Sequence, residues 1–176
     1  DGQSIAFVRA ARTTIQVGLL ATVRSDIYLI SADPSANAAP VPVVGASGND
    51  GLNYYPAFSP DGRWLAFTFH RNSTTYSDPE AEIWLLNLET GVAGPITGNP
   101  PNASNSWATW NRDGTMLAFN TTAHDPNFDI VVVDVNPDGT TGAPRKLRGA
   151  SLPGVFEHLP YWGDPIDRVN LLDEWR

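Results

Sequence analysis

Three histidines and several acidic residues are the side chains of this chain best suited to acid–base chemistry or metal binding. The segment from His124 to Asp129 brings an imidazole and carboxylates close together in the sequence. Calcium takes about six to eight oxygen ligands, and this segment offers too few at a suitable spacing. His70 and His158 lie in other parts of the chain. No pattern gathers the histidines at one site, so we expect no metal and no other cofactor.

The sequence also lacks the motifs of enzymes that use a serine or cysteine nucleophile. A serine hydrolase needs a nucleophile on a G-x-S-x-G turn, followed by a histidine and an acid. The chain has no such motif. It also has no cysteine, which excludes disulfides and thiolate metal sites. The sequence therefore favours a protein without catalytic residues.

The remaining candidates are aromatic and amide side chains in two matching segments. One segment reads NYYPAFSPDGRWLAF from Asn53, and the other reads NSWATWNRDGTMLAF from Asn105. Tyr54, Tyr55 and Trp107 each combine an apolar ring with a polar group, a combination that is common where proteins bind one another. What these side chains can do depends on the elements that hold them.

Both segments belong to a longer internal repeat. An Asp-Gly pair and a short run ending in Ala-Phe occur at 1–7, 61–67 and 113–119. An acidic residue followed by four apolar residues comes next in each copy, at 26–30, 82–86 and 129–133. A weaker third block lies at 40–44, 94–97 and 144–147. The period is roughly fifty to sixty residues, which is typical of repeat architectures.

Each repeat predicts four short β-strands. An Asp-Gly pair forms a tight hairpin because glycine accepts positive φ without steric cost. The segments 12–25 and 72–80 are predicted to be loops between the second and third strands, and helix signals are nearly absent before residue 165. Four-stranded antiparallel units at this spacing are the blades of a β-propeller. We therefore predict an all-β propeller over 1–165, with repeats at 1–46, 53–99 and 105–149.

The repeat resembles that of a known family. PAFSPDGRWLAF, followed by EIWLLN and a short PIT strand, is similar to the TolB-type propeller repeat. Repeats of the same style occur in the amino-terminal propellers of the prolyl oligopeptidase family. The resemblance extends from residue 1 to about 165, but Asn111 and Arg112 replace Ser-Pro in the third copy and 161–165 is a decayed copy. The resemblance implies the fold, whereas propellers serve many unrelated functions.

The predicted number of blades is about three. The first repeat begins at its Asp-Gly turn, and 156–163 looks like a first strand with no further strands after it, so the two together would complete one blade. Propellers typically have about four to eight blades. Three interpretations stay open: a fragment of a longer propeller, a six-blade ring closed by a second copy (the blade number usual for the TolB type), or an open arc covered by a partner protein. A start without methionine indicates a processed or trimmed product.

The first strand of each blade lines the axis of a propeller, so its first residues are expected at the mouth of the channel. We predict that this position binds a partner, with ordinary packing at the blade edge as the alternative. The candidate residues are Asn53, Tyr54, Tyr55, Asn105, Ser106, Trp107, Glu157 and His158.

The tail at 166–176 differs from the repeats. Its apolar residues recur every third position, as in one short amphipathic helix or turn. It either caps the last blade or docks on a partner through Val169, Leu172 and Trp175.

Composition excludes several classes of function. The formal net charge of -8 argues against nucleic acid, because phosphate binding needs clustered Lys and Arg. The densest basic group, Arg145, Lys146 and Arg148, is interpreted as a solvated strand edge. No apolar run has the length of a membrane helix.

These features together predict a non-catalytic propeller scaffold or accessory subunit. Its partner would be another protein or protein complex, or a second copy of itself, in the periplasm or another extracytoplasmic compartment of a bacterium. The alternative is an enzyme part: the propeller of a hydrolase, or a small-ligand-binding or lyase-type propeller with a site in its channel.

Overall fold

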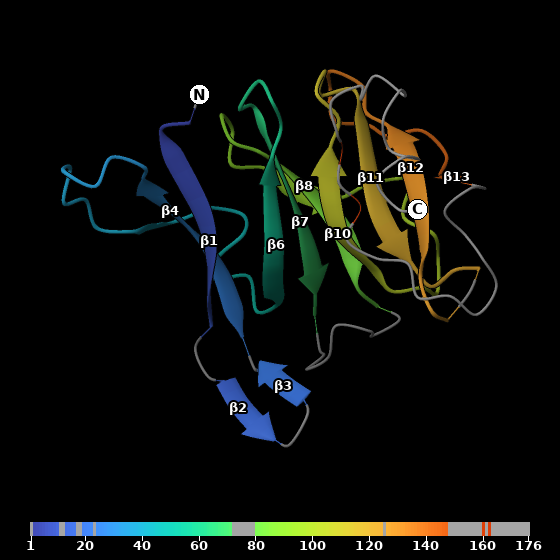
Figure 1. The fold of residues 1–176 in the computed structure, drawn as a ribbon, viewed down its shortest axis with the longest axis horizontal. Helices are drawn as coiled ribbons and strands as arrows, with labels where there is room; N and C mark the ends of the chain where they lie inside the picture. The colour runs from blue at the N-terminus through green and yellow to red at the C-terminus, as the bar shows by residue number, and fades with distance from the viewer. Residues whose placement is uncertain are drawn as a thin grey trace, which may run out of the picture.

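The computed structural model describes residues 2–10, 13–16, 19–22, 24–71, 80–124, 126–147, 160 and 162, with only the backbone at 13–16 and 19–22. These residues form thirteen β-strands and no helix (Figure 1). Within the same ranges, therefore, no helix is present that could cross a membrane. The all-β prediction is confirmed.

Two four-stranded antiparallel blades form the main body of the structure. In each blade the strands pair in chain order, and the first and second strands run in opposite directions (Figure 1). Blade two consists of β6 Leu52–Phe58, β7 Trp64–His70, β8 Glu82–Asn87 and β9 Ala93–Pro95. Blade three consists of β10 Asn105–Trp110, β11 Met116–Thr121, β12 Asp129–Asp134 and β13 Arg145–Lys146.

Blade one contains only the second, third and fourth strands of the repeat. These are β1 Ser4–Ala10, β4 Ser25–Ser31 and β5 Val41–Pro42. One parallel pair, Ser25 with Leu52, continues the hydrogen-bonded sheet from blade one into blade two.

The prediction of a plain loop at 12–25 is wrong. Strands β2 Thr13–Gln16 and β3 Leu19–Thr22 form a separate antiparallel hairpin there, and it projects beyond the ends of the blade strands (Figure 1). Threonine and isoleucine in β2 favour extended backbone because their branched Cβ atoms suit a pleated strand. The segment is therefore a second hairpin inserted between two strands of the blade.

The Asp-Gly turns form as predicted, and the departure in the third copy preserves the turn. Gly62 and Gly114 both have positive φ, at 72° and 70°. In blade two the Ser59 hydroxyl accepts a hydrogen bond from the Trp64 N–H at 2.9 Å. In blade three the Asn111 side-chain oxygen accepts the equivalent bond from the Met116 N–H, also at 2.9 Å. Asparagine therefore replaces serine with the same acceptor function.

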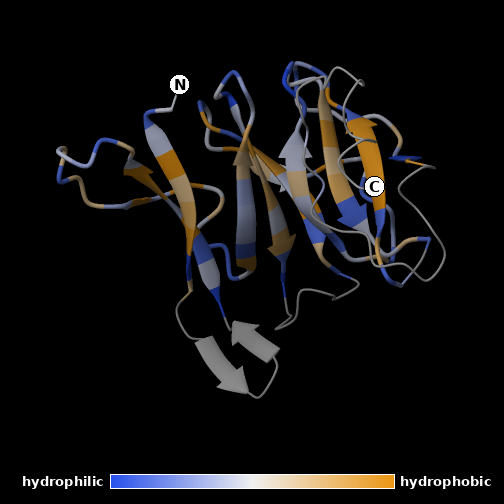
Figure 2. Cartoon of the chain, in the orientation of Figure 1, coloured by the Kyte–Doolittle hydropathy of each residue, from blue (hydrophilic) through white to orange (hydrophobic). Residues whose placement is uncertain are grey.

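Apolar side chains fill the two spaces between blades. Figure 2 shows that long stretches of the blade strands are hydrophobic. The indole N–H of Trp110 also donates to the Ala57 carbonyl at 3.1 Å, which joins the first strands of blades two and three. The core between blades one and two includes Ile27, Val43, Leu65, Phe67 and Leu86. The core between blades two and three includes Ala66, Ile83, Leu85, Trp110, Leu117, Phe119, Val131 and Val133.

The basic residues on β13 are paired with acids. Arg145 and Lys146 are exposed, as expected for a strand edge. Arg145 makes a two-point contact with Asp134, and the Lys146 ammonium lies 2.9 Å from a carboxylate oxygen of Asp129. Arg148 lies outside the described residues.

Truncation of the core between blades tests this packing. Phe119 is 0% exposed, so Phe119→Ala should lower the free energy of unfolding by about 3 to 5 kcal/mol through lost burial and a residual cavity. Denaturant unfolding followed by circular dichroism measures the change. Val92 is 68% exposed, and Val92→Ala should change the value by less than about 0.5 kcal/mol. Equal effects of both substitutions would contradict the assigned core.

Acid should weaken the turn of blade two. Hydrogen bonds from the Ser59 hydroxyl and then the Arg63 N–H hold the pKa of Asp61 below its ordinary value of 3.8. A carboxyl group whose pKa is lower in the folded state stabilises the fold above its unfolded pKa, and this contribution disappears as pH falls through the folded pKa. Asp61→Asn keeps an acceptor but cannot titrate. The variant should therefore lose less stability than the wild type between about pH 5 and about pH 2 in denaturant unfolding; identical pH profiles would exclude this role.

A candidate binding site on the first strands of two blades

The same irregularity occurs in the first strands of blades two and three. In β6, Tyr54 and Ala57 are three positions apart along the chain, whereas their partners on β7 are only two positions apart. β10 has the same shift between Ser106 and Thr109. Each strand therefore contains a β-bulge with one extra residue, and such bulges often re-aim a side chain next to a functional site.

An aromatic residue occupies the strained position of each bulge. Tyr55 has φ of 53°, and Trp107 has φ of 57°. This left-handed region is usually left to glycine or asparagine, and holding another residue there costs on the order of 1 to 3 kcal/mol. Tyr55 and Trp107 are 52 residues apart and match each other in the repeat. The strain is thus a repeated property of the first strands and not a single irregular residue.

The bulges bring four aromatic rings together. The ring centroids of Tyr55 and Trp107 are 5.0 Å apart, across the boundary between blades two and three. Tyr54 meets Tyr55 edge-on at 5.0 Å, and Phe128 meets Trp107 edge-on at 5.9 Å. Tyr54 and Phe128 are buried, whereas Tyr55 and Trp107 are partly exposed. We call Tyr54, Tyr55, Trp107 and Phe128 the aromatic cluster.

The amide residues that precede the bulges are enclosed. Asn53 is 0% exposed, and its amide donates to the Ser25 carbonyl at 2.9 Å and to the Asn49 side chain at 2.8 Å. The Ser25 hydroxyl donates in turn to the Asn53 carbonyl at 3.0 Å. Asn53 therefore fixes the start of β6 against blade one, and its side chain makes its contacts inside the protein.

Asn105 has the matching place in blade three. Its amide donates to the Pro100 carbonyl at 3.0 Å and to the Ala103 carbonyl at 3.2 Å, which holds the loop before β10. The side-chain oxygen of Asn105 and the hydroxyl of Ser106 are both buried and have no hydrogen-bond partner among the described residues. A buried acceptor without a donor is costly, so the Asn105 oxygen is a candidate contact for a ligand that enters beside it.

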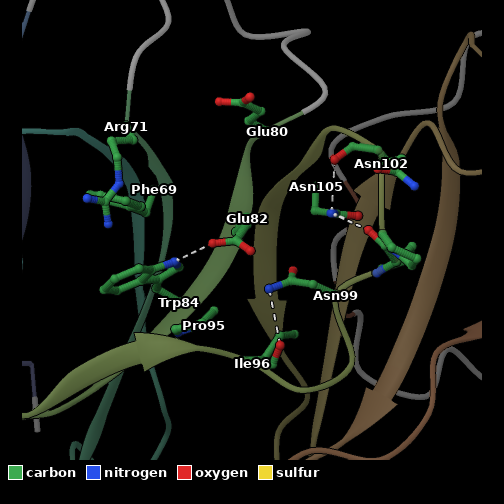
Figure 3. A pocket seen from close by; sticks show the side chains of 13 residues that line it. Phe69, Arg71, Glu80, Glu82, Trp84, Pro95, Ile96, Asn99, Asn102 and Asn105 are labelled. Carbon is green, nitrogen blue, oxygen red and sulfur yellow. Dashed lines mark hydrogen bonds between the residues drawn. The ribbon is translucent and has the colours of Figure 1, made fainter.

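A hollow of about 510 Å³ lies next to Asn105, at the end of blade two where β7 finishes and β8 begins. Figure 3 shows Arg71 and Glu80 at one end of the hollow and Pro95 with Ile96 at the other. Inside it, the Trp84 indole N–H donates to the Glu82 carboxylate at 3.0 Å, and the Phe69 ring lies 4.3 Å from that of Trp84. The lining offers one cation, two carboxylates and a pair of aromatic rings in contact.

On one wall of the hollow, the polar side chain of Asn99 makes its hydrogen bonds within the protein. The side-chain oxygen of Asn99 accepts from the Ile83 N–H at 2.9 Å, and its amide donates to the Ile83 carbonyl at 2.9 Å. Asn99 is thus fully used in holding its loop against β8. No group of three or more histidine or acidic side chains that could hold a metal ion occurs in the described part of the chain.

The structure brings together the six predicted residues that it describes, on the first strands of blades two and three. Tyr54, Tyr55 and Trp107 belong to the aromatic cluster, while Asn53, Asn105 and Ser106 are buried on the same strands. The other predicted residues lie outside the described ranges: Glu157, His158, Val169, Leu172 and Trp175.

Sequence reasoning missed Phe128 and the hollow. Phe128 stands just before the acidic residue of the third repeat, and nothing in its type or spacing indicated contact with Trp107. The residues of the hollow come from β7, β8, β9 and β10 and from the segments between these strands, so no single motif contains them.

Comparison with known proteins gives the fold class. No family model matches the chain. No curated protein matches it either. Among solved structures, TolB from Agrobacterium tumefaciens aligns over 78% of this chain and 44% of its own, with 18% identity and a TM-score of 0.52. A puromycin-hydrolyzing peptidase from Mycobacterium tuberculosis aligns over 79% of this chain and 23% of its own, with 16% identity and a TM-score of 0.50.

The chain therefore has a β-propeller fold of the kind seen in TolB and in peptidases of the prolyl oligopeptidase type, as the repeat predicted. It spans less than half the length of either structure. The likeness defines the class of fold, and the function has to be argued from the site.

Proposed function

We propose that this chain is a non-catalytic propeller module that binds another protein through the aromatic cluster, in an extracytoplasmic compartment of a bacterium. The observation that carries the proposal is the repeated bulge that holds Tyr55 and Trp107 at positive φ with their rings 5.0 Å apart. A fold keeps strain of this kind where the surrounding structure enforces it, and such positions concentrate at ligand-binding sites.

The chemistry of the cluster suits a protein partner. Tyrosine and tryptophan offer large rigid rings with few rotatable bonds, so they lose little entropy on binding and are enriched among residues that dominate interface energies. The buried rings of Tyr54 and Phe128 support the partly exposed pair, Tyr55 and Trp107, by edge-on contacts. The neighbouring hollow adds the carboxylates of Glu80 and Glu82, which can accept hydrogen bonds from a bound segment.

Substitution of the exposed pair tests the proposal. Tyr55→Asn and Trp107→Asn remove the rings but keep a residue type that tolerates positive φ. Affinity should fall by roughly thirty-fold or more for each variant if the pair dominates the interface, which corresponds to about 2 kcal/mol. A partner captured from an envelope extract of the source organism and then purified would serve as the ligand, with titration calorimetry as the measurement.

The matched control is Val44→Asn. Val44 is 76% exposed and lies outside the cluster, so this variant should bind as the wild type does. Circular dichroism should show that all three variants keep the strand content of the wild type. Unchanged affinity of both cluster variants would refute the proposed binding surface.

The second candidate is the binding of a small ligand in the hollow, as in the enzyme alternative. The buried oxygen of Asn105, which lines the hollow and lacks a donor in the described structure, is the observation that favours it. A ligand for this place needs a hydrogen-bond donor such as a hydroxyl or an ammonium group. Metal analysis of the purified protein and hydrolase or lyase assays separate the enzyme alternative from the first candidate. A non-catalytic module should give no signal in either measurement.

A further inference from the structure

A partly buried ion pair in blade three lies next to the aromatic cluster. Asp129 is the first residue of β12, and the Lys146 ammonium on β13 lies 2.9 Å from its carboxylate. The Asp129 side chain is 3% exposed, whereas that of Lys146 is 36% exposed. An unpaired buried charge is strongly unfavourable. Loss of the Lys146 cation would therefore drive the Asp129 carboxylate towards water.

The residue before this carboxylate is a member of the cluster. Phe128 has φ of 68°, is 5% exposed and contacts the Trp107 ring edge-on at 5.9 Å. Positive φ is strained for an aromatic residue and persists only where the surrounding structure enforces it. Phe128 and Asp129 share a peptide bond, so a movement of Asp129 changes the backbone that directs the Phe128 ring.

The ion pair lies on the side of blade three that faces blade two. Val131 and Val133 belong to the core between these blades, and neighbouring side chains of a strand alternate between its faces. Asp129 therefore shares the face of Val131, and Lys146 is the partner of Val131 in the register of β12 and β13. The aromatic cluster spans the boundary between the same two blades. The pair and the cluster thus belong to one boundary between blades.

The matching positions of blades one and two are different. The residue before the acid is small there, serine in one blade and alanine in the other. The acids accept hydrogen bonds from uncharged groups: Asp26 from the Gly48 N–H at 2.8 Å, and Glu82 from the Trp84 indole N–H at 3.0 Å. An acid at this place in the repeat thus does not require a lysine. The lysine accompanies the aromatic residue in blade three.

We propose that Lys146 is a positioning residue for the aromatic cluster. By pairing with Asp129 it fixes the start of β12, and through the adjoining peptide bond it keeps the Phe128 ring against Trp107. The ammonium group acts through these residues and needs no contact with a bound partner. The importance of this role for binding rests on the function proposed above, whereas the position of the rings can be measured in the free protein.

Fluorine NMR of protein labelled with 5-fluorotryptophan reports the position of the rings. Trp107→Phe assigns the Trp107 resonance, and Phe128→Leu gives the frequency of this resonance without the Phe128 ring. Lys146→Met keeps an unbranched side chain but removes the charge. Its Trp107 resonance should move from the wild-type frequency towards that of Phe128→Leu, because the Phe128 ring leaves its place beside the indole. Lys146→Arg keeps the charge and should retain the wild-type frequency.

Arg145→Met is the matched control on the same strand. Arg145 pairs with Asp134, and these side chains are 52% and 53% exposed. Arg145 is the partner of Val132 in the strand register, so it lies on the face of blade three opposite to that of Asp129. The variant removes a cation and an ion pair, as Lys146→Met does. Its Trp107 resonance should stay at the wild-type frequency.

Asp129→Asn keeps the test valid if Lys146→Met does not fold. It removes the ion pair but leaves no unpaired charge in the interior, because the Lys146 side chain reaches water. Its Trp107 resonance should move in the same direction as that of Lys146→Met, since an amide attracts the ammonium less than a carboxylate does. Circular dichroism checks the strand content of every variant.

The affinity for the partner purified to test Tyr55 and Trp107 is the second measurement. Lys146→Met should lower it by roughly two-fold or more, the smallest effect usual between coupled side chains, and Arg145→Met should leave it unchanged. A shifted resonance with unchanged affinity would retain the positioning role and refute the function proposed above. Wild-type Trp107 frequencies in folded Lys146→Met and Asp129→Asn would overturn the proposal, because the ion pair would then stabilise the fold without positioning the rings. An equal shift in Arg145→Met would overturn it as well.

Discussion

The two-sided burial of each blade is the constraint on which the rest of the structure depends. In β7 the consecutive residues Leu65, Ala66 and Phe67 are all 0% exposed, although neighbouring side chains of a strand point to opposite faces. A sheet with two apolar faces is stable in water only when another layer covers each of them. Blade two meets this condition through blades one and three. Stacking of similar blades is thus the direct consequence of strands that have no polar face.

The Asp-Gly turns and the bulges of the first strands use positive φ for two different needs. The hairpin turns give it to glycine, as at Gly62 and Gly114, where no side chain is needed and strain is avoided. In the bulges, Tyr55 and Trp107 have positive φ. Glycine would adopt this conformation with less strain but would remove the ring. Contacts within the aromatic cluster offset part of this strain, since paired rings contribute about 0.5 to 1.5 kcal/mol beyond their burial. The first strands therefore keep the two aromatic rings although their backbone is strained at these positions.

The fold was more predictable from the sequence than the site was. Asp-Gly pairs and acid-plus-apolar blocks specify turns and strands locally, so their repetition predicted the blades. Asn111 stood out in the sequence only as a departure from the repeat, and the structure supplied its role as a hydrogen-bond acceptor in the turn. A bulge is a shift of one residue between two strands, and residue types on one strand do not encode it. For the same reason the burial of Asn53 and Asn105 was not foreseen, because it depends on loops and blades that close over them. The hairpin at β2 and β3 was missed because its few residues interrupt the repeat instead of following it.

The geometry of the aromatic cluster depends on how blades two and three pack on each other. Tyr55 and Trp107 lie on the first strands of these two blades, and the side chains of the core between the blades are buried. The Trp110 indole N–H joins the same two strands through its hydrogen bond to the Ala57 carbonyl. Two rings on separate blades keep a fixed separation only when the blades themselves are held together. The apolar core between the blades and the hydrogen bond between their first strands therefore position the rings, while the bulges direct them.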